Sequence, residues 1–254
     1  MRRRVCLLLV PLLILAATGV QAQLRFLTAD QVAFAADLGR QNPAPGQHRV
    51  LFIGNSFTYE HDVPALVVGR AEAEGYRLAH AVLAEGGARL SLTLSMTGVA
   101  DVLRHGDWDA VVLQDHSTTA LDPAYAREGR AAVRFAAWMV SPAPVVLFTP
   151  WARAEGHPLY SRRELRPGVA PPRTPAAMTA ATSAQAEMLL ADLPNLRHAP
   201  VARAWADAIA AGAALHAPDR YHANMAGAAL TAEVLWATLA PLLAASEATA
   251  DAAD

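Results

Sequence analysis

The sequence contains a single cysteine and no lysine. The cysteine, Cys6, lies in an apolar run at the N-terminus, so a chain that has lost this run has no thiol at all. Disulfides and thiolate metal sites are thereby excluded from the rest of the protein. Because every basic residue is an arginine, we interpret the lack of lysine as codon bias and not as a functional signal.

Metal-binding patterns, internal repeats and a strong net charge are also missing. The nine histidines show no His-x-x-x-His spacing, so we expect no metal site. Charged residues make up 17% of the chain, and its net charge is −2. Losing Arg2, Arg3 and Arg4 would leave 18 basic against 23 acidic residues, a net charge of −5. Such a chain has no general attraction for nucleic acid, and we expect no nucleic-acid partner.

Residues 1 to 22 have the pattern of a cleavable signal peptide. Arg2, Arg3 and Arg4 precede an apolar run from Val5 to Ala17, and small residues flank Gln21. The run is shorter than the roughly 18 to 20 residues that span a bilayer. We therefore expect a secreted or periplasmic protein with no stable membrane anchor after cleavage, although an uncleaved anchor is an alternative reading of the same run.

The remaining 232 residues or so suit one domain, because apolar strand-like runs alternate with longer helical segments. This alternation predicts a doubly wound, mostly parallel sheet covered on both faces. Residues 23 to 48 read as an N-terminal helix and linker, residues 49 to 243 as the main domain, and residues 244 to 254 as a C-terminal tail. The expected strands are Val50 to Ile53, Arg77 to Leu83, Asp109 to Leu113, Pro144 to Phe148 and an edge strand at Arg197 to Val201.

The segment from Trp151 to Thr174 interrupts this alternation. It carries five arginines and, together with Pro175, five prolines. A loop of this length after a strand is usually either functional or poorly ordered. It can thus lie over the active edge of the sheet as a lid, or it can be a solvated insertion, and the sequence leaves both open.

Ser56 occupies the place where an open α/β sheet binds its ligands. It follows the run Val50 to Ile53 and Gly54, so it lies just beyond the carboxyl end of a predicted strand. A serine hydroxyl becomes a useful nucleophile when a base can reach it. Near the C-terminus, Asp219 and His222 are three residues apart in a loop before a helix. The carboxylate can accept a bond from the imidazole Nδ1–H while Nε2 stays available as that base.

Four short motifs together resemble the ordered blocks of the SGNH hydrolase (GDSL esterase/lipase) superfamily. They are Gly54-Asn55-Ser56-Phe57-Thr58, Gly86-Gly87, Leu113-Gln114 and Asp219-x-x-His222. The resemblance spans residues 49 to 243 and implies a flavodoxin-like, three-layer α/β/α sandwich. It also implies a serine hydrolase that needs no cofactor, because this chemistry uses only side chains and water.

The resemblance assigns a role to each matching residue. Ser56 would be the nucleophile, His222 the base and then the acid, and Asp219 the residue that orients the imidazole. The oxyanion would be held by the backbone N–H groups of Ser56 and Gly87 and by the side-chain amide of Gln114. The family commonly has Asn in the third block, and we choose Gln114 over its neighbour because an ionised aspartate cannot donate a hydrogen bond.

The sequence thus predicts an exported serine esterase that cleaves carboxylic esters, with acetyl esters on glycans as candidate substrates. Two other functions remain open: a glycan O-acyltransferase, and a non-catalytic glycan-binding domain on the same fold. Simpler readings of single residues also remain, namely Ser56 as a turn residue, His222 as a surface cap and Gly86 in place of Gly87 as donor.

Overall fold

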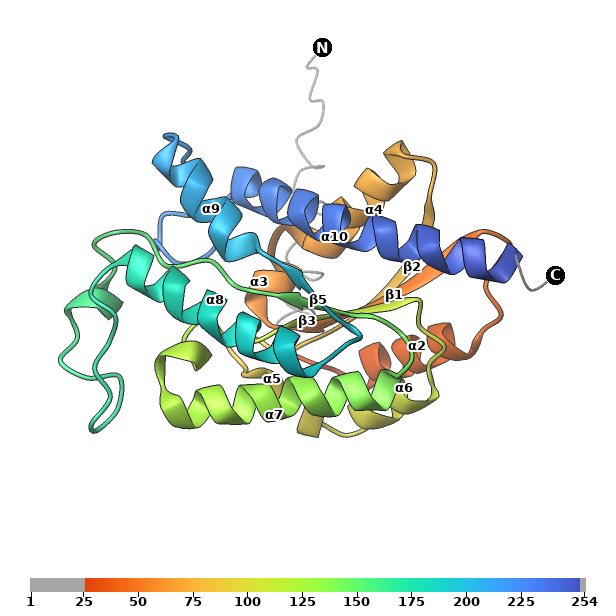
Figure 1. The fold of residues 1–254 in the computed structure, drawn as a ribbon, viewed down its shortest axis with the longest axis horizontal. Coiled ribbons are helices and arrows are strands. Elements are labelled where there is room, and N and C mark those ends of the chain that lie inside the picture. Colours follow the sequence, from red (N-terminus) through yellow and green to blue (C-terminus); the bar gives the residue numbers. More distant parts are fainter. Residues whose placement is uncertain (1–25, 252–254) are drawn as a thin grey trace, which may run out of the picture.

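A parallel β-sheet between two layers of helices forms the centre of the protein (Figure 1). The structure, a computed structural model, describes residues 26 to 251. The predicted signal segment, residues 1 to 22, lies outside the described residues. The observed architecture is the three-layer α/β/α sandwich expected from the sequence.

The sheet in the described part of the chain has five strands in the order β2-β1-β3-β4-β5, and all neighbours are parallel. The strands are β1 (Gln47–Gly54), β2 (Arg77–Ala84), β3 (Ala110–Gln114), β4 (Val145–Phe148) and β5 (Leu196–Ala199). The carboxyl ends of β1, β2 and β3 meet at one edge, because Ile53 is opposite both Leu83 and Leu113. The first three sequence blocks therefore converge there.

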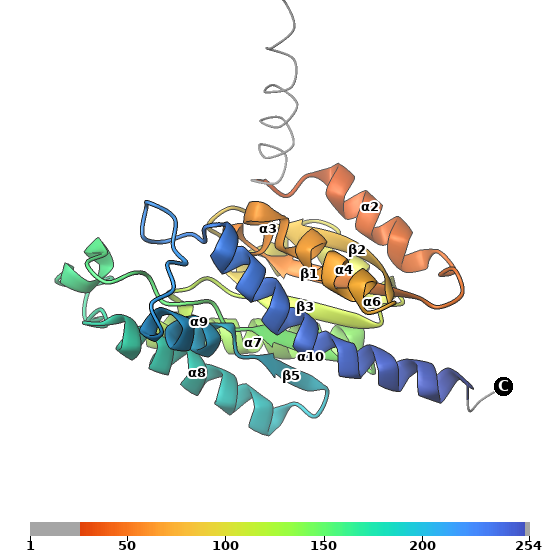
Figure 2. The same ribbon diagram turned by 90° about the horizontal axis from the view of Figure 1, so that it is seen from above.

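The helices divide between the two faces of the sheet (Figures 1 and 2). On one face lie α2 (Ala29–Arg40), α5 (Leu90–Ser95), α6 (Val99–His105), α7 (Pro123–Val140) and α8 (Pro175–Asp192). On the other face lie α4 (Val63–Ala73), α9 (Val201–Ala210) and α10 (Met225–Asp251). Shorter elements at the edge are α3 (Ser56–Tyr59), η1 (Glu60–Asp62), η2 (Thr119–Leu121) and η3 (Pro158–Ser161).

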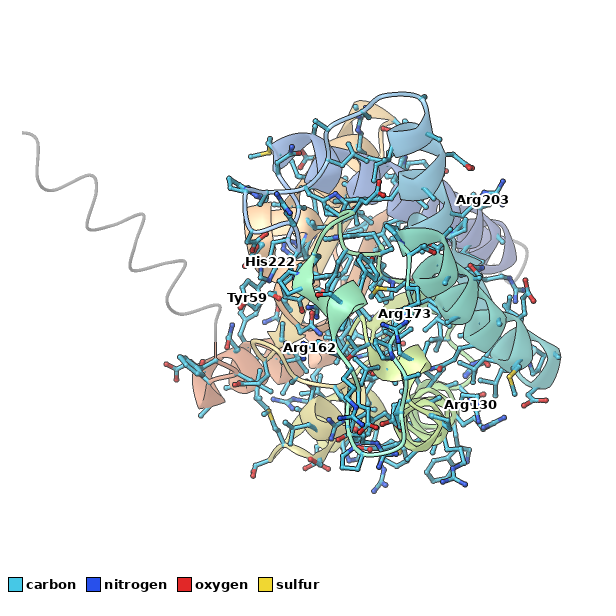
Figure 3. The ribbon with its side chains drawn as sticks, turned by 90° about the vertical axis from the view of Figure 1, so that its left-hand side faces the viewer. Tyr59, Arg130, Arg162, Arg173, Arg203 and His222 are labelled. Carbon is cyan, nitrogen blue, oxygen red and sulfur yellow. The ribbon has the colours of Figure 1, made fainter. Side chains whose placement is uncertain are left out.

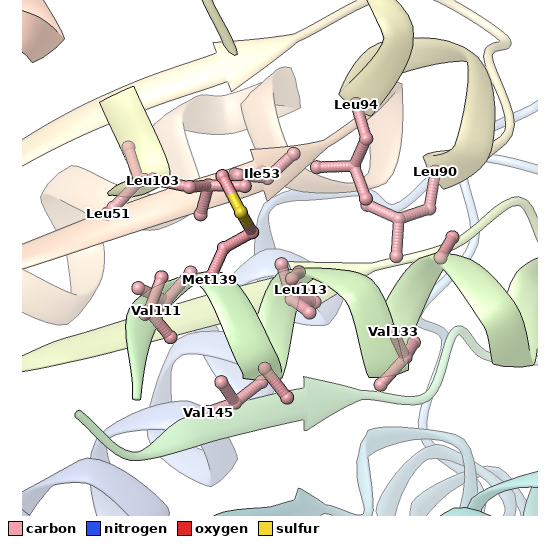
Figure 4. Close-up of a cluster of buried hydrophobic side chains, with 14 of the residues drawn as sticks. Leu51, Ile53, Leu90, Leu94, Leu103, Val111, Leu113, Val133, Met139 and Val145 are labelled. Atoms are coloured by element: carbon pink, nitrogen blue, oxygen red, sulfur yellow. The ribbon is translucent and has the colours of Figure 1, made fainter. Parts of the chain in front are cut away.

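The central strand β1 supplies side chains to both layers in turn. Leu51 and Ile53 pack into the cluster beneath α5, α6 and α7 (Figure 4), whereas Val50 and Phe52 pack against α4 and α10. Alternate side chains of a strand point to opposite faces, so a strand that is covered on both sides must be apolar throughout. This explains why the run reads as continuously hydrophobic.

Two helices begin at polar side chains that cap them, as the residue types at these positions in the sequence indicate. The Thr28 side chain accepts the Gln31 N–H, while the Gln31 side chain accepts the Thr28 N–H, which is a complete capping box at the start of α2. The Asp62 side chain accepts the Ala65 N–H at the start of α4.

Two helices differ in extent from what the sequence suggests. The apolar, helix-like run at residues 90 to 103 forms two helices, α5 and α6, which are divided at Gly98, whose φ of +83° is unsuited to an α-helix. A Cβ at Gly98 would lie 2.7 Å from Val32, so this position also depends on close packing. The expected tail from residue 244 continues α10 as far as Asp251.

Helix α10 is the one described helix that is long and apolar enough to cross a bilayer, judged by length and composition over Met225–Ala245. In the structure it packs against α4, α9 and the sheet (Figure 2). Its buried side chains include Leu235, Trp236, Leu239 and Leu243. Its apolar character is therefore used in the core.

We expect Leu103→Ala on α6 to lower the free energy of unfolding by about 2 to 5 kcal/mol, because it leaves a cavity at a side chain that is 0% exposed. Leu92→Ala on α5 is the matched control, because Leu92 is 51% exposed. Urea denaturation of both variants tests this, and equal midpoints would contradict the assigned core.

Candidate active site

Ser56 is the first residue of α3, directly beyond the carboxyl end of β1. Asn55 caps this short helix, since its Oδ1 accepts the Phe57 N–H at 3.1 Å. The backbone bends between strand and helix at Gly54, where a Cβ would lie 2.2 Å from Thr58 Oγ1 and 2.6 Å from Gln114 Oε1. Gly54 is therefore required by close packing, and it lets the chain turn so that Ser56 sits at the sheet edge.

The structure brings Ser56, His222 and Asp219 into one hydrogen-bonded chain. His222 Nε2 lies 3.0 Å from Ser56 Oγ, and His222 Nδ1 lies 2.6 Å from Asp219 Oδ2. Because a carboxylate can only accept, the proton is on Nδ1, and the Nε2 lone pair faces the serine hydroxyl. Residues 166 positions apart in the sequence thus have the geometry of a nucleophile and its base.

Asp219 is held in place by more than the imidazole. Its Oδ1 also accepts the backbone N–H groups of Tyr221 and His222, at 2.9 and 3.0 Å. Burial raises the pKa of Asp219, but the hydrogen bonds from His222 and from these two N–H groups outweigh it, so the pKa lies below the ordinary value. The carboxylate therefore stays ionised and keeps its orientation.

Glu60 is an acid of the site that the sequence analysis missed. Its Oε1 lies 3.6 Å from His222 Nε2, farther away than Ser56 Oγ. Ser56 is thus the nearer partner of the imidazole, while the Glu60 carboxylate can stabilise a positive charge on it. No motif marks Glu60, but its position four residues after Ser56, one helical turn along, was a usable signal.

The Gly86-Gly87 turn lies beside the serine loop. The Glu85 N–H donates to the Gly54 carbonyl at 3.2 Å, and Asn55 Nδ2 donates to the Ala88 carbonyl at 2.9 Å. Gly87 has a φ of +70°, and a Cβ there would meet nothing within 4 Å. The turn therefore borders open space next to the nucleophile loop, where a substrate can approach the backbone.

The amide of Gln114 is engaged inside the fold, in contrast to its predicted role as a donor to the oxyanion. Its Oε1 accepts the Asn55 N–H at 2.9 Å and the Thr58 hydroxyl at 3.0 Å, and its Nε2 donates to the Asp115 carbonyl. The side chain is 1% exposed. Gln114 thus anchors the serine loop from below, and the described contacts include none between Gln114 and Ser56 or Gly87.

Asp115 links the third strand to the second loop. Its Oδ1 accepts the N–H groups of Leu90 and His116, at 2.9 and 2.7 Å. Burial raises the pKa of Asp115, although these backbone bonds act in the opposite direction. The residue that follows Gln114 therefore fixes the start of α5 and, with it, the neighbouring glycine turn.

The arginine-rich segment after β4 contacts the loop that carries the base. Trp151 Nε1 donates to the Tyr221 carbonyl at 3.0 Å, and the Ala154 N–H donates to the Arg220 carbonyl at 2.9 Å. Figure 3 shows Arg162 at the same end of the molecule as His222 and Tyr59. The start of the segment thus packs at the active edge, whereas most residues from 161 to 170 are exposed.

Three aromatic rings stack behind the nucleophile. Phe57 lies 4.1 Å from Trp151, and Trp151 lies 4.0 Å from Trp205, each pair with an interplanar angle of 2°. The stack ties α3 to the loop after β4 and to α9. Sequence reasoning missed it, because these rings come from three distant elements. Within residues 26 to 251, no cluster of His, Cys, Asp or Glu could hold a metal ion.

Comparison with known proteins concerns the fold as a whole. No family model and no curated protein matches the sequence. A solved structure assigned to the SGNH hydrolases, from Slackia heliotrinireducens, matches with a TM-score of 0.60 and 28% identity, over 76% of this chain and 99% of that one. The chain belongs to the SGNH hydrolase superfamily. By this likeness the chain is a hydrolase.

More distant structures share the SGNH hydrolase fold. A DUF4886 family protein from Bacteroides uniformis has a TM-score of 0.59 at 18% identity, over 76% of this chain and 83% of that one. A family 3 carbohydrate esterase from Clostridium thermocellum has a TM-score of 0.58 at 9% identity, over 78% of this chain and 98% of that one. At these identities the likeness concerns the fold alone.

We expect Gly54→Ala to destabilise the SGNH hydrolase by about 1 to 3 kcal/mol and to reduce its activity, because the new methyl group displaces Thr58 and Gln114. Gly69→Ala on α4 is the control, since nothing lies within 4 Å of its added Cβ. That variant should be neutral or stabilised by about 0.5 to 1 kcal/mol. Thermal unfolding of both variants measures the difference, and equal effects would contradict the close packing at Gly54.

Proposed function

We propose that this protein is a serine esterase that cleaves carboxylic esters through an acyl-enzyme on Ser56. The observation that supports this most directly is the continuous chain Asp219–His222–Ser56, with distances of 2.6 and 3.0 Å. Such a chain supplies a nucleophile, a base within reach and a group that fixes the base.

In this mechanism the Ser56 hydroxyl attacks the ester carbonyl while its proton moves to His222 Nε2. The imidazolium that forms is stabilised by Asp219 and, from the other side, by Glu60. His222 then gives the proton to the departing alcohol, which leaves the acyl group on Ser56. A water molecule, deprotonated by the same nitrogen, releases the acid and restores the hydroxyl.

The oxyanion is held in our proposal by the backbone N–H groups of Ser56 and Gly87. Within the described residues, neither of these N–H groups donates a hydrogen bond to another protein group. Both therefore remain available to an oxygen that becomes negative during the reaction. We assign Gln114 as a positioning residue, because its contacts hold Asn55, the neighbour of Ser56.

We also propose where the protein acts and which class of ester it cleaves. The signal pattern of residues 1 to 22 supports export. An exported esterase encounters glycans outside the cytoplasm, so we propose short acyl esters such as acetyl groups on glycans as substrates. No cofactor takes part in these steps.

We expect Ser56→Ala and His222→Ala to lower kcat for an activated acetyl ester by about 10⁴-fold or more, because the triad acts as a unit. A fluorophosphonate probe should add once to the parent protein and not to Ser56→Ala, as read by intact mass. Ser95→Ala, at an exposed serine of α5, should keep full activity and labelling. Full activity in Ser56→Ala would disprove the nucleophile.

Asp219→Asn should lower kcat by about 10² to 10⁴-fold at pH 7, because an amide no longer fixes the Nδ1–H tautomer. The folded-state pKa of Asp219 lies below 3.8, its ordinary value. Its ionised form therefore stabilises the fold fully above pH 3.8, and this contribution is lost as the pH falls through the folded pKa. The difference in unfolding free energy between parent and variant, followed by urea titration from pH 7 to pH 3, should shrink at the acid end. A difference that grows there would contradict the assignment.

A further inference from the structure

The guanidinium group of Arg153, which has no ion-pair partner among the described side chains, lies next to the proposed triad. The Arg153 guanidinium carbon is 4.1 Å from the centre of the Tyr221 ring, and that ring is 4.2 Å from the His222 ring. The side chain therefore reaches the edge of the site from the segment after β4. Burial is the main cause that lowers the pKa of Arg153, and Arg162 adds to it, whereas Tyr221, Tyr160 and Asp219 act in the opposite direction.

The acids around Arg153 are engaged elsewhere. Asp219 binds His222 and two backbone N–H groups, and Glu60 lies on the opposite side of the imidazole, 3.6 Å from Nε2. Among the side chains that the structure describes, no carboxylate lies within ion-pair distance of Arg153, and its buried Nε has no hydrogen-bond partner. A half-buried guanidinium with an unpartnered buried Nε and no carboxylate nearby is a favourable place for an anion from outside the chain.

His157 presents a second donor at the same place. The Leu159 N–H donates to His157 Nδ1 at 3.0 Å, so Nδ1 is an acceptor and the proton must be on Nε2. This Nε2 lies 3.4 Å from Arg153 Nη1, which is also a donor. Two N–H groups thus face each other and cannot bond. Burial, Arg153 and Arg162 lower the pKa of His157, which keeps the ring neutral.

His116, two residues beyond the end of β3, has the same tautomer as His157. The Thr118 N–H donates to His116 Nδ1 at 3.2 Å, which leaves the proton on Nε2, 3.5 Å from the Tyr221 hydroxyl. Burial, Arg153 and Arg89 lower the pKa of His116 to about 4. His116 is therefore neutral at physiological pH, and its Nε2–H is directed at the Tyr221 hydroxyl.

We propose that Arg153, His157 and His116, grouped around the Tyr221 ring, form a subsite for an oxyanionic group, a carboxylate or a phosphate, carried by the substrate. This inference rests on the proposed function, since it names the substrate class of the same site. Carboxylates and phosphates accept several hydrogen bonds at once and match the fork of a guanidinium. One bound carboxylate or phosphate can accept hydrogen bonds from Arg153 Nη1 and His157 Nε2, the two donors that face each other.

Calorimetry at constant ionic strength can compare the binding of three probes: the sugar acid glucuronate, inorganic phosphate and neutral glucose. Ser56→Ala serves as the parent, so that no turnover interferes. We expect glucuronate, phosphate or both to bind at least about 10-fold more tightly than glucose. Arg153→Gln in this parent should lose about 10-fold or more of that affinity, and Arg153→Lys should lose less.

Arg163→Gln is the matched control, because Arg163 is an exposed residue of the same segment and its loss changes the net charge equally. It should bind the anions as the parent does. Equal anion binding in Arg153→Gln and Arg163→Gln, or glucose binding as tight as that of both anions, overturns the subsite. If Arg153→Gln does not fold, Arg153→Lys tests whether the guanidinium recognises the anion. Full affinity for the anions in the lysine variant would contradict recognition by the guanidinium fork.

Fluorophosphonate labelling of the wild-type protein is recorded separately. Labelling without anion binding would refute the subsite and leave the esterase standing. Anion binding without labelling would refute the esterase alone. A preference for glucuronate over phosphate would identify an acidic glycan, and the reverse preference a phosphorylated ester.

Discussion

The hydrogen bond from the backbone N–H of Asn55 to Gln114 Oε1 joins the ends of β1 and β3, and the site depends on this junction. A parallel sheet brings strand ends together but leaves their loops free to diverge. Here one buried side chain accepts from the serine loop, while the next residue, Asp115, accepts from the start of α5. Asn55 closes the arrangement through the Ala88 carbonyl. Three loops are thus held together by hydrogen bonds between buried polar groups. These bonds fix the position of the Ser56 hydroxyl.

Much of this arrangement follows from the sequence. Continuous apolar runs such as Val50 to Ile53 identify buried parallel strands, because both faces must be covered. Caps such as Thr28 and Asp62 have local causes, so local reasoning finds them. The grouping of Ser56, Asp219 and His222 was anticipated because each belongs to a motif at an element boundary, and the structure places them in hydrogen-bond contact.

Other features have causes that are distant in the sequence. Gln114 carries an amide that can either donate to a ligand or accept from the backbone, and only the three-dimensional neighbours decide between them. The helix break at Gly98 depends on Val32, and the aromatic stack depends on Trp205, which is 148 residues from Phe57. Likewise, His116 and His157 become donors through backbone N–H groups that fix their tautomers. None of these relations leaves a periodic or local signal.

The contacts of the segment after β4 also limit how the protein can open. The Ala154 N–H and the Trp151 indole bind the carbonyls of the two residues that precede His222. A movement of the whole segment would therefore draw the His222 imidazole away from Ser56 and disrupt the triad. Beyond Gly156, whose φ is +73°, the backbone contacts to this loop end, apart from the Arg220 side chain on the Gly156 carbonyl. Residues beyond Gly156 are held elsewhere, because Leu159 and Tyr160 pack against Met178 and Arg166 pairs with Asp122. The loop that carries the base and the outer part of the segment are therefore anchored independently of each other.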